Sequence, residues 1–343
     1  MRIHELTEVD AKEISSWNYE KEYQIYNCPS WETMCEEKWA MTISEKRKKE
    51  FRKIIDENEN IIGYFRFKKN NNKIIIGLGM NPQLCGKGNG HLFINKIIEF
   101  LKDKTNVIEL EVREFNKRAI RCYEKSGFKI IDKQLKQTRN GEDEFIIMQY
   151  NYKLIYYHAS PYQNIKVLEP RISNHKKSLI YFSTKKENVL VYLSNAIEKY
   201  CKDTNFKHEG IYSTWGPYSF TKEGLLQLEE YYPNALEETY KGISGYIYST
   251  STIPNMKTLP EIKDVHVTDS NTTIENVEHI ADAYEEILKY EKLGLIKILR
   301  YEEFIKTKKD WLYKTIQKEY EESINQPEYR YFLKNKFPFI KIW

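Results

Sequence analysis

The chain of 343 residues is longer than one hydrophobic core comfortably serves, so we expect about two domains. Hydrophobic residues make up 41% and charged residues 30%, a composition that is typical of a folded protein and excludes a disordered chain. With 54 Lys and Arg against 50 Asp and Glu the net charge is only +4, and no basic stripe predicts nucleic-acid binding.

Cysteine usage and hydropathy give further expectations. The five cysteines are widely spaced and form no Cys-x-x-Cys pair, so neither a disulfide framework nor a metal site is predicted. Residues 1–17 lack the apolar core of a signal peptide, and no stretch approaches the ~18 apolar residues of a membrane span. We therefore expect a cytoplasmic protein without a membrane partner.

The N-terminal part begins with helices and continues with strands. Residues 1–60 read mostly as helices, including the charged run SEKRKKEFRK, which is expected to be a solvated helix face. Strands are predicted at 60–67 and 73–80. Three glycines then lead into a helix at 91–104, whose apolar residues recur at helical spacing. Its expected buried face comprises Leu92, Phe93, Ile94, Ile97, Ile98 and Leu101.

The chain then alternates between strands and a short helix. Apolar and acidic residues alternate along a strand at 106–112. Asn116 is placed to begin the short helix as its N-cap, and Gly127 is placed to end it. A strand at 144–152 closes this half. The order of elements predicts an α/β (α+β) layer arrangement.

Beyond a boundary at Tyr152 the rhythm changes, and residues 153–343 are assigned to a second α+β domain. Its acid-rich stretch EEYYPNALEETY reads as a solvated helix, and the tail from Tyr301 is expected to pack back as a helical cap. Strands are expected at 154–158, 179–183, 245–249, 264–268 and 275–280, with a helix near 186–203 and a loop-rich section at 204–244.

The glycines lie in QLCGKGNGHLF, residues 83–93. This stretch lacks the Ser or Thr that follows Gly-Lys in a Walker loop, and it lacks the spacing of a dinucleotide fingerprint. Unsatisfied amide groups at the start of a helix attract phosphate, and glycine lets a ligand approach the backbone closely. The residues favour a phosphate-binding turn, and a plain β–α turn without a ligand stays open.

Two segments resemble one known family. Gln83-x-x-Gly86-x-Gly88 resembles the Gln/Arg-x-x-Gly-x-Gly/Ala signature of the GCN5-related N-acetyltransferases (GNAT family). ELEVREFNKRAIRCYEKSGFK resembles that family's strand, Asn, short helix and Tyr-x-x-x-Gly-Phe segment. The resemblance covers about residues 1–150, and it implies a mixed sheet with flanking helices and direct acetyl transfer from acetyl-CoA to an amine. The acceptor, a small molecule or a protein amine, is not readable, and a homodimer is one option because domains of this type often pair.

The same resemblance assigns roles to individual residues. The backbone of 84–90 would cradle the pyrophosphate of acetyl-CoA, and Met80 would offer backbone groups to the pantetheine and thioester. Asn116 would hydrogen-bond the cofactor arm, and Tyr123 would be the general acid that protonates the departing thiolate. The implied cofactor-binding residues are Met80, Gln83, Leu84, Cys85, Gly86, Lys87, Gly88, Asn89, Gly90 and Asn116.

The general base is left unassigned by the sequence. The strand KIIIGLGM carries no carboxylate, although many relatives have one there. Glu109 and Glu111 on the next strand are substitutes, or equally plain surface residues. Cys85 and Cys122 are expected near the thioester without acting as nucleophiles.

The second half resembles a different family. Tyr157-His158-Ala159-Ser160 resembles the strand-end Tyr-His-Gly-Thr of rifampin ADP-ribosyltransferase and its kin, and Tyr181 matches their nicotinamide-stacking tyrosine. The resemblance implies an ADP-ribosyltransferase-like domain with NAD near His158, Ser160 and Tyr181. Ile253 stands where relatives carry an acid, so the domain is expected to be degenerate unless Glu261 or Asp264 replaces that acid.

We therefore expect an N-acetyltransferase in residues 1–152, accompanied by an accessory or nucleotide-binding domain in residues 153–343. Two alternatives stay open. The second domain could be an active NAD-dependent ADP-ribosyltransferase, or both halves could be cofactor-binding modules without turnover.

Overall fold

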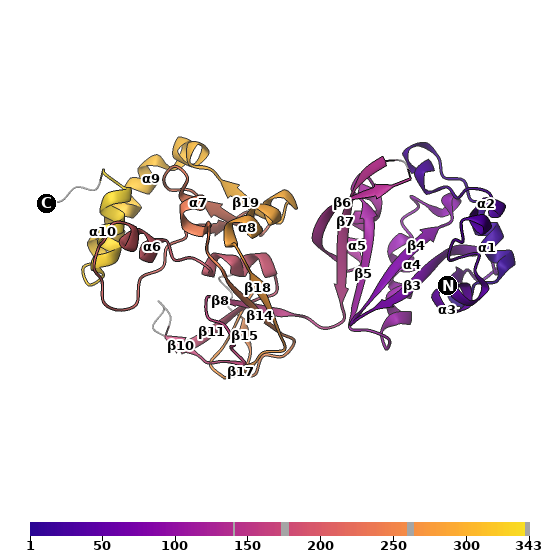
Figure 1. Cartoon of the computed structure of the whole chain (residues 1–343), viewed down its shortest axis with the longest axis horizontal. Coiled ribbons are helices and arrows are strands. Elements are labelled where there is room, and N and C mark those ends of the chain that lie inside the picture. The colour runs from indigo at the N-terminus through magenta and orange to yellow at the C-terminus, as the bar shows by residue number, and fades with distance from the viewer. Residues whose placement is uncertain (140, 173–177, 259–263, 340–343) are drawn as a thin grey trace. The chain divides into compact units, whose positions relative to one another are not determined.

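The computed structural model describes residues 1–139, 141–172, 178–258 and 264–339 (Figure 1). The chain forms two compact units, Met1–Lys153 and Leu154–Trp343. The division falls next to Tyr152, where the sequence places the boundary. Each unit has its own sheets and its own apolar clusters.

The first unit is built on a seven-stranded sheet with the order β1-β2-β3-β4-β5-β7-β6. Strands β4 and β5 pair in parallel, whereas their neighbours pair antiparallel. The mixed sheet is confirmed, but β1, β2 and β6 were not predicted, and the first two lie in the segment 1–60 that was expected to be mostly helical. The strands are β1 (Arg2–Glu5), β2 (Phe51–Ile55), β3 (Ile61–Asn70), β4 (Lys73–Met80), β5 (Val107–Arg113), β6 (Lys129–Thr138) and β7 (Gly141–Asn151).

Helices cover both faces of this sheet. Phe93 and Ile97 of α4 and Ile120 of α5 pack into a cluster on one face, whereas Ile14 of α1 and Met34 of α2 pack into a cluster on the other. The α-helices are α1 (Glu8–Ser15), α2 (Trp31–Glu36), α3 (Ser44–Glu50), α4 (Gly90–Leu101) and α5 (Lys117–Lys125), and the 3₁₀ helices are η1 (Lys21–Tyr26) and η2 (Pro82–Leu84).

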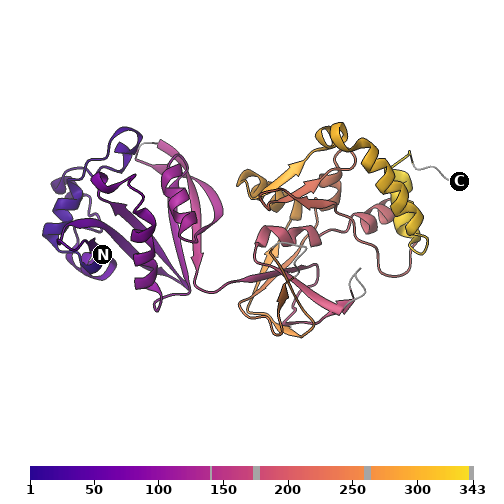
Figure 2. The ribbon, with the colours of Figure 1, turned by 180° about the vertical axis from the view of Figure 1, so that it is seen from behind.

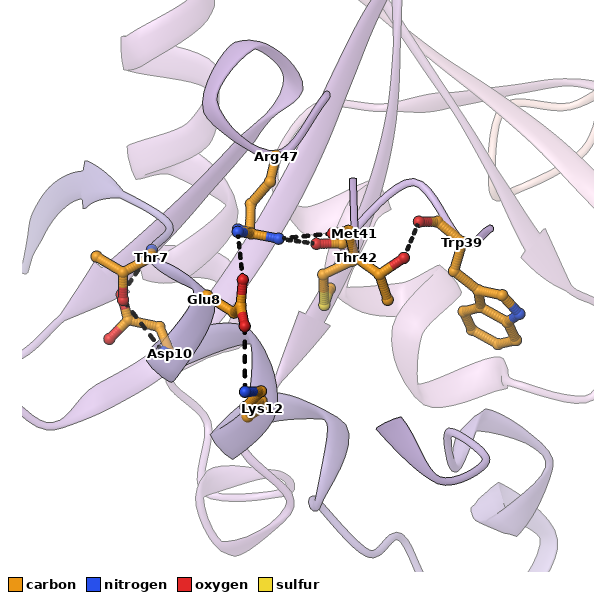
Figure 3. A network of polar contacts seen from close by, with 8 residues as sticks. All are labelled: Thr7, Glu8, Asp10, Lys12, Trp39, Met41, Thr42 and Arg47. Atoms are coloured by element: carbon orange, nitrogen blue, oxygen red, sulfur yellow. Dashed lines mark hydrogen bonds and ion pairs between the residues drawn. The ribbon is translucent and has the colours of Figure 1, made fainter. Parts of the chain in front are cut away.

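The charged run SEKRKKEFRK forms a largely exposed helix over Ser44–Glu50, as predicted, and its last three residues begin β2. Arg47 within it is only 5% exposed. Its guanidinium donates to the carbonyls of Met41 at 2.9 Å and Thr42 at 3.1 Å, and pairs with Glu8 at 3.2 Å (Figure 3). A guanidinium with several acceptors can be buried, and charge spacing alone does not reveal those acceptors.

The start of α1 is fixed by a capping box. The Thr7 hydroxyl accepts from the amide of Asp10 at 3.2 Å, and the Asp10 carboxylate accepts from the amide of Thr7 at 2.8 Å (Figure 3).

Farther along the chain, α4 begins where expected, but Leu92 was wrongly placed on its buried face. Leu92 is 50% exposed, because at about 100° per residue it points from the side of α4 opposite the buried Phe93, Ile97 and Leu101.

The second unit contains a larger antiparallel sheet of order β15-β16-β11-β8-β14-β18, with β10 beside β11. Strands β12-β13-β19 and β17-β9 form two smaller sheets. The five predicted strands correspond to β8, β11, β14, β16 and β18. The strands are β8 (Tyr156–Ser160), β9 (Val167–Leu168), β10 (Arg171–Ile172), β11 (Ser178–Ser183), β12 (Tyr218–Phe220), β13 (Leu226–Glu229), β14 (Gly245–Thr250), β15 (Lys257–Thr258), β16 (Val265–Thr268), β17 (Thr272–Thr273), β18 (Asn276–Ile280) and β19 (Ile296–Leu299).

The helix predicted at 186–203 is two helices, η3 and α6, separated by the non-helical Leu193 at φ −89°, ψ 48°. The section 204–244, which was predicted to be rich in loops, also contains β12, β13 and α7. Helix α8, which follows β18, was not predicted. The helices of this unit are η3 (Lys186–Tyr192), α6 (Ala196–Asp203), α7 (Ala235–Tyr240), α8 (Ala283–Lys292), α9 (Tyr301–Glu322) and α10 (Pro327–Lys336).

The tail packs back onto its own unit. Helix α10 lies beside α6, as the opposite views in Figures 1 and 2 both show. Phe304 of α9 and Phe332 of α10 share a buried cluster with Ile197 and Trp215. No helix among the described residues is long and apolar enough to cross a membrane.

The acid-rich stretch at 229–240 is not a solvated helix. Glu229 and Glu230 are 6% and 5% exposed. Glu229 accepts from Lys308 at 3.0 Å, at the point where α9 kinks. Glu230 accepts from the amide of Tyr301 at 3.3 Å, and so it satisfies the first turn of α9. These two carboxylates therefore anchor the beginning of the tail.

Candidate active site

The central strands of the first unit separate part-way along their length. Strands β4 and β5 pair in parallel, and their last registered pair is Ile76 with Leu110. Beyond it, Gly77–Met80 continues to pair with β3, and Glu111–Arg113 with β7. The two strand ends line a pocket of about 570 Å³. Backbone groups that face this gap have lost a strand partner, so a ligand can supply one.

The glycine-rich stretch forms the turn at one end of this pocket. Gly86 and Gly88 have φ values of +77° and +82°, the left-handed region in which L side chains are disfavoured. Gly90 has a different requirement, because a Cβ there would lie 2.6 Å from Sγ of Cys122. The first two glycines therefore shape the turn, and the third lets α4 approach α5.

The turn presents backbone amides to the pocket. Asn89, the N-cap of α4, makes no side-chain capping hydrogen bond. Within the described chain, the amides of Gly86, Lys87 and Gly88 have no protein acceptor. Free amides at a helix N-terminus carry a partial positive charge, which suits a phosphate.

Cations from α5 reinforce this end of the pocket. Arg118, Arg121 and Lys125 line it. A Cβ on Gly86 would lie 3.9 Å from Nη1 of Arg118, whose guanidinium lies 4.3 Å from the ring centre of Tyr23. We did not identify these residues from the sequence. The sequence did contain a signal for them, because their spacing of three and then four residues places all three cations on one face of the helix.

Tyr123 and Asn116 lie in the same pocket. Burial raises the pKa of the Tyr123 phenol, so the hydroxyl keeps its proton. The Asn116 side chain accepts from the amide of Ala119 at 3.1 Å, as the predicted N-cap of α5 should. Its amide group donates to the Tyr26 hydroxyl at 3.1 Å. A cofactor that used this amide would therefore replace Tyr26.

Backbone and thiol groups complete the centre of the pocket. The Met80 carbonyl accepts from the Tyr19 hydroxyl at 2.9 Å and from Sγ of Cys85 at 3.7 Å. All five cysteines are free. Burial raises the pKa of Cys28, Cys85 and Cys122, so these pocket thiols hold little thiolate at neutral pH.

The structure thus brings together most, but not all, of the residues singled out in the sequence. Gln83, Lys87 and Asn89 have exposed side chains, and Leu84 packs against the core, so the described lining does not include these four. The sequence-selected residues that do line the pocket are Met80, Cys85, Gly86, Gly88, Gly90, Asn116 and Tyr123.

The two candidate bases lie on the same face of β5, but only one of them lines the pocket. Glu109 is buried and pairs with Lys73 at 2.6 Å, outside the pocket. Glu111 lines the pocket, and its Oε1 accepts from Lys136 at 2.6 Å. Glu111 is therefore the carboxylate that a ligand in this pocket would meet.

The arrangement of this pocket coincides with a family match. Residues 11–128 match the acetyltransferase (GNAT) family. The matched region, called the GNAT region below, contains the separated strands β4 and β5, the glycine turn and the whole of α5, and it ends at Phe128.

Several solved structures are similar to this chain. A chimera of spermidine N-acetyltransferase SpeG from Vibrio cholerae and hSSAT is 22% identical, with 44% of this chain and 94% of that chain covered and a TM-score of 0.37. The aminoglycoside acetyltransferase AAC(6')-Ib in complex with coenzyme A is 19% identical, with 44% and 94% covered and a TM-score of 0.35. A ribosomal-protein-alanine N-acetyltransferase from Brucella melitensis is 15% identical, with 44% and 99% covered and a TM-score of 0.36.

In the second unit, two of the three sequence-selected residues meet. Nδ1 of His158 lies 2.9 Å from the Tyr181 carbonyl, and the imidazole is 5.9 Å from the Phe182 ring. Burial lowers the pKa of His158, so the ring is neutral at physiological pH. Ser160 lies farther along β8, where its hydroxyl accepts from the amide of Tyr162 at 3.3 Å.

The second unit lacks a free carboxylate at the two described positions where the resemblance led us to look for the catalytic acid, Ile253 and Asp264. Ile253 packs into a buried cluster with Tyr156 and Phe182. Asp264 pairs with Lys185 at 3.2 Å. Glu261 lies outside the described residues.

Proposed function

We propose that the GNAT region transfers the acetyl group of acetyl-CoA directly to an amine. One observation carries this proposal, namely that a single pocket joins the unpartnered amides of the glycine turn to the buried phenol of Tyr123. The turn and Arg118 would hold the pyrophosphate. The pantetheine would then run between β4 and β5, where it meets backbone groups without a strand partner.

The residues at the other end of the pocket fit the chemistry of amine acylation. Glu111 would accept a proton from the acceptor ammonium, directly or through water. The neutral amine attacks the thioester carbonyl, a C–N bond forms, and the C–S bond of the tetrahedral intermediate breaks. Tyr123 would donate its proton to the departing thiolate, which its raised pKa keeps available. No covalent enzyme intermediate is required.

Paired variants test this assignment. With acetyl-CoA and an amine acceptor, we expect Tyr123→Phe and Glu111→Gln each to lower kcat by ~10²–10⁴-fold. Binding of CoA, measured by calorimetry, should change little, because neither side chain is placed at the phosphates. Glu109→Gln on the same strand is the matched control and should retain kcat. Full kcat in both Tyr123→Phe and Glu111→Gln would contradict the proposed roles.

For the second unit we propose an accessory, nucleotide-binding role in preference to ADP-ribosyl transfer. His158 and Tyr181, two of the residues that the resemblance assigns to NAD, lie together. The burial of Ile253 and the pairing of Asp264 with Lys185 leave no free carboxylate at those two positions. Titration of the full chain and of His158→Ala with NAD tests this role. NAD cleavage that is lost in His158→Ala would instead favour the transferase alternative.

A further inference from the structure

The segment between α1 and α2 is closed into a loop by one asparagine side chain. The side chain of Asn27 accepts from the amide of Tyr19 at 2.7 Å, and it donates to the Tyr19 carbonyl at 3.1 Å. It also donates to the side chain of Asn18 at 2.8 Å. Helix η1 lies between these two ends. Residues 18–27, called the tyrosine loop below, are therefore tied together at their base and can move as one unit.

Two hydroxyls of the tyrosine loop occupy groups that the resemblance assigns to the arm of the cofactor. The Tyr19 hydroxyl donates to the Met80 carbonyl at 2.9 Å, and the Tyr26 hydroxyl accepts from the Asn116 amide group at 3.1 Å. Burial raises the pKa of the Tyr19 phenol, so the proton that it donates stays in place. Each amide of pantetheine offers an N–H donor and a carbonyl acceptor. One tyrosine therefore takes the place of an amide N–H, and the other takes the place of an amide carbonyl.

The tyrosines are in contact with one another and with the phosphate end of the pocket. The rings of Tyr19 and Tyr26 lie edge to face with their centres 6.3 Å apart, and Tyr23 stacks on Tyr26 at 6.5 Å. The ring centre of Tyr23 lies 4.3 Å from the guanidinium of Arg118, the cation proposed to hold the pyrophosphate. A ligand that displaces one hydroxyl therefore disturbs the packing of the whole loop.

We propose, resting on the acetyl transfer proposed above, that the tyrosine loop competes with the pantetheine arm and is released when the arm binds. The amides of the arm replace the hydroxyls of Tyr19 and Tyr26 on Met80 and Asn116. The nucleotide part of CoA has no pantetheine amides, so it would bind at the glycine turn and leave the loop in place. Loading with the complete cofactor is thereby coupled to a movement of residues 18–27.

Calorimetric titration of the full chain tests this competition. The probes are CoA and adenosine 3′,5′-diphosphate, which is the nucleotide part without the arm. Tyr19→Phe and Tyr26→Phe each remove one competing hydrogen bond, so each should lower Kd for CoA by ~2–10-fold. Neither should change Kd for adenosine 3′,5′-diphosphate. Tyr23→Phe is the matched control, because it keeps the ring that contacts Arg118, and it should leave Kd for CoA unchanged.

Limited proteolysis follows the loop directly. Trypsin cuts after Lys21, which is exposed in the loop, when the surrounding backbone is released from its contacts. We expect CoA to accelerate this cleavage in the wild type and adenosine 3′,5′-diphosphate to leave its rate unchanged, with the fragments identified by mass spectrometry. Slower cleavage with CoA would mean that the loop closes over the arm, and it would overturn the inference.

The outcomes separate this inference from the proposed function. A Kd for CoA that is unchanged or raised in either Tyr19→Phe or Tyr26→Phe overturns the competition and leaves acetyl transfer intact. An equal gain of affinity for adenosine 3′,5′-diphosphate also overturns it, because the effect would not depend on the arm. Absence of CoA binding to the wild type removes the proposed function, and this inference falls with it.

Discussion

A charge placed in the glycine turn should weaken cofactor binding by an amount that follows from the geometry. A side chain at Gly88 meets nothing within 4 Å, so a substitution causes no clash, although φ of +82° costs about 1 kcal/mol. A carboxylate at about 5 Å from a phosphate adds about 1–3 kcal/mol of repulsion at an effective dielectric of roughly 20–80. Gly88→Asp should therefore raise Kd for CoA by ~5–150-fold beyond any backbone effect.

Gly88→Asn isolates the charge, because Asn has the same shape as Asp and tolerates the same left-handed backbone. Calorimetric titration with CoA should give a Kd for Gly88→Asn within a few-fold of the wild type. The excess loss in Gly88→Asp should shrink as salt is added. If the two variants weaken binding equally, or if Gly88→Asp binds normally, the phosphate does not lie at this turn and the reasoning fails.

Three further outcomes are expected. Burial raises the pKa of Tyr123 above its ordinary value near 10. Activity that needs the Tyr123 proton is therefore present below that pKa and should be lost only above pH ~10. A loss of activity below pH 9 that disappears in Tyr123→Phe would contradict this. Arg47→Lys should lower the free energy of unfolding by about 2 kcal/mol in denaturant titration, since an ammonium cannot reproduce three directed contacts. Lys308→Met should cost about 3 kcal/mol, because Glu229 stays buried without its cation, whereas the exposed Lys306→Met should cost little.

Local signals predicted the parts of the first unit that depend on neighbouring residues in the chain. Strand alternation located β5, helical spacing located α4, and the N-cap preference of asparagine placed Asn116 at the start of α5. Each of these patterns is complete within about ten residues, so a short stretch of sequence is enough to locate the element.

Features that depend on distant partners could not be predicted. Arg47 pairs with Glu8, which lies 39 residues earlier in the chain, and Glu229 is buried because Lys308 reaches it from a helix far along the chain. Sequence alternation also left Glu109 and Glu111 equivalent. Only the separation of β4 from β5 gives one of them a pocket and the other a buried ion pair.

The separation of β4 from β5 also bears on hydrogen exchange. Amides of Gly77–Met80 that point away from β3 have no strand opposite them, so their protons should exchange with solvent faster than those of Ile74–Ile76, where the ladder is complete. A molecule seated between the two strands would slow that exchange at those few amides. Deuterium uptake along this single strand can therefore report whether the gap is occupied, and by which compounds, before any catalytic assay exists.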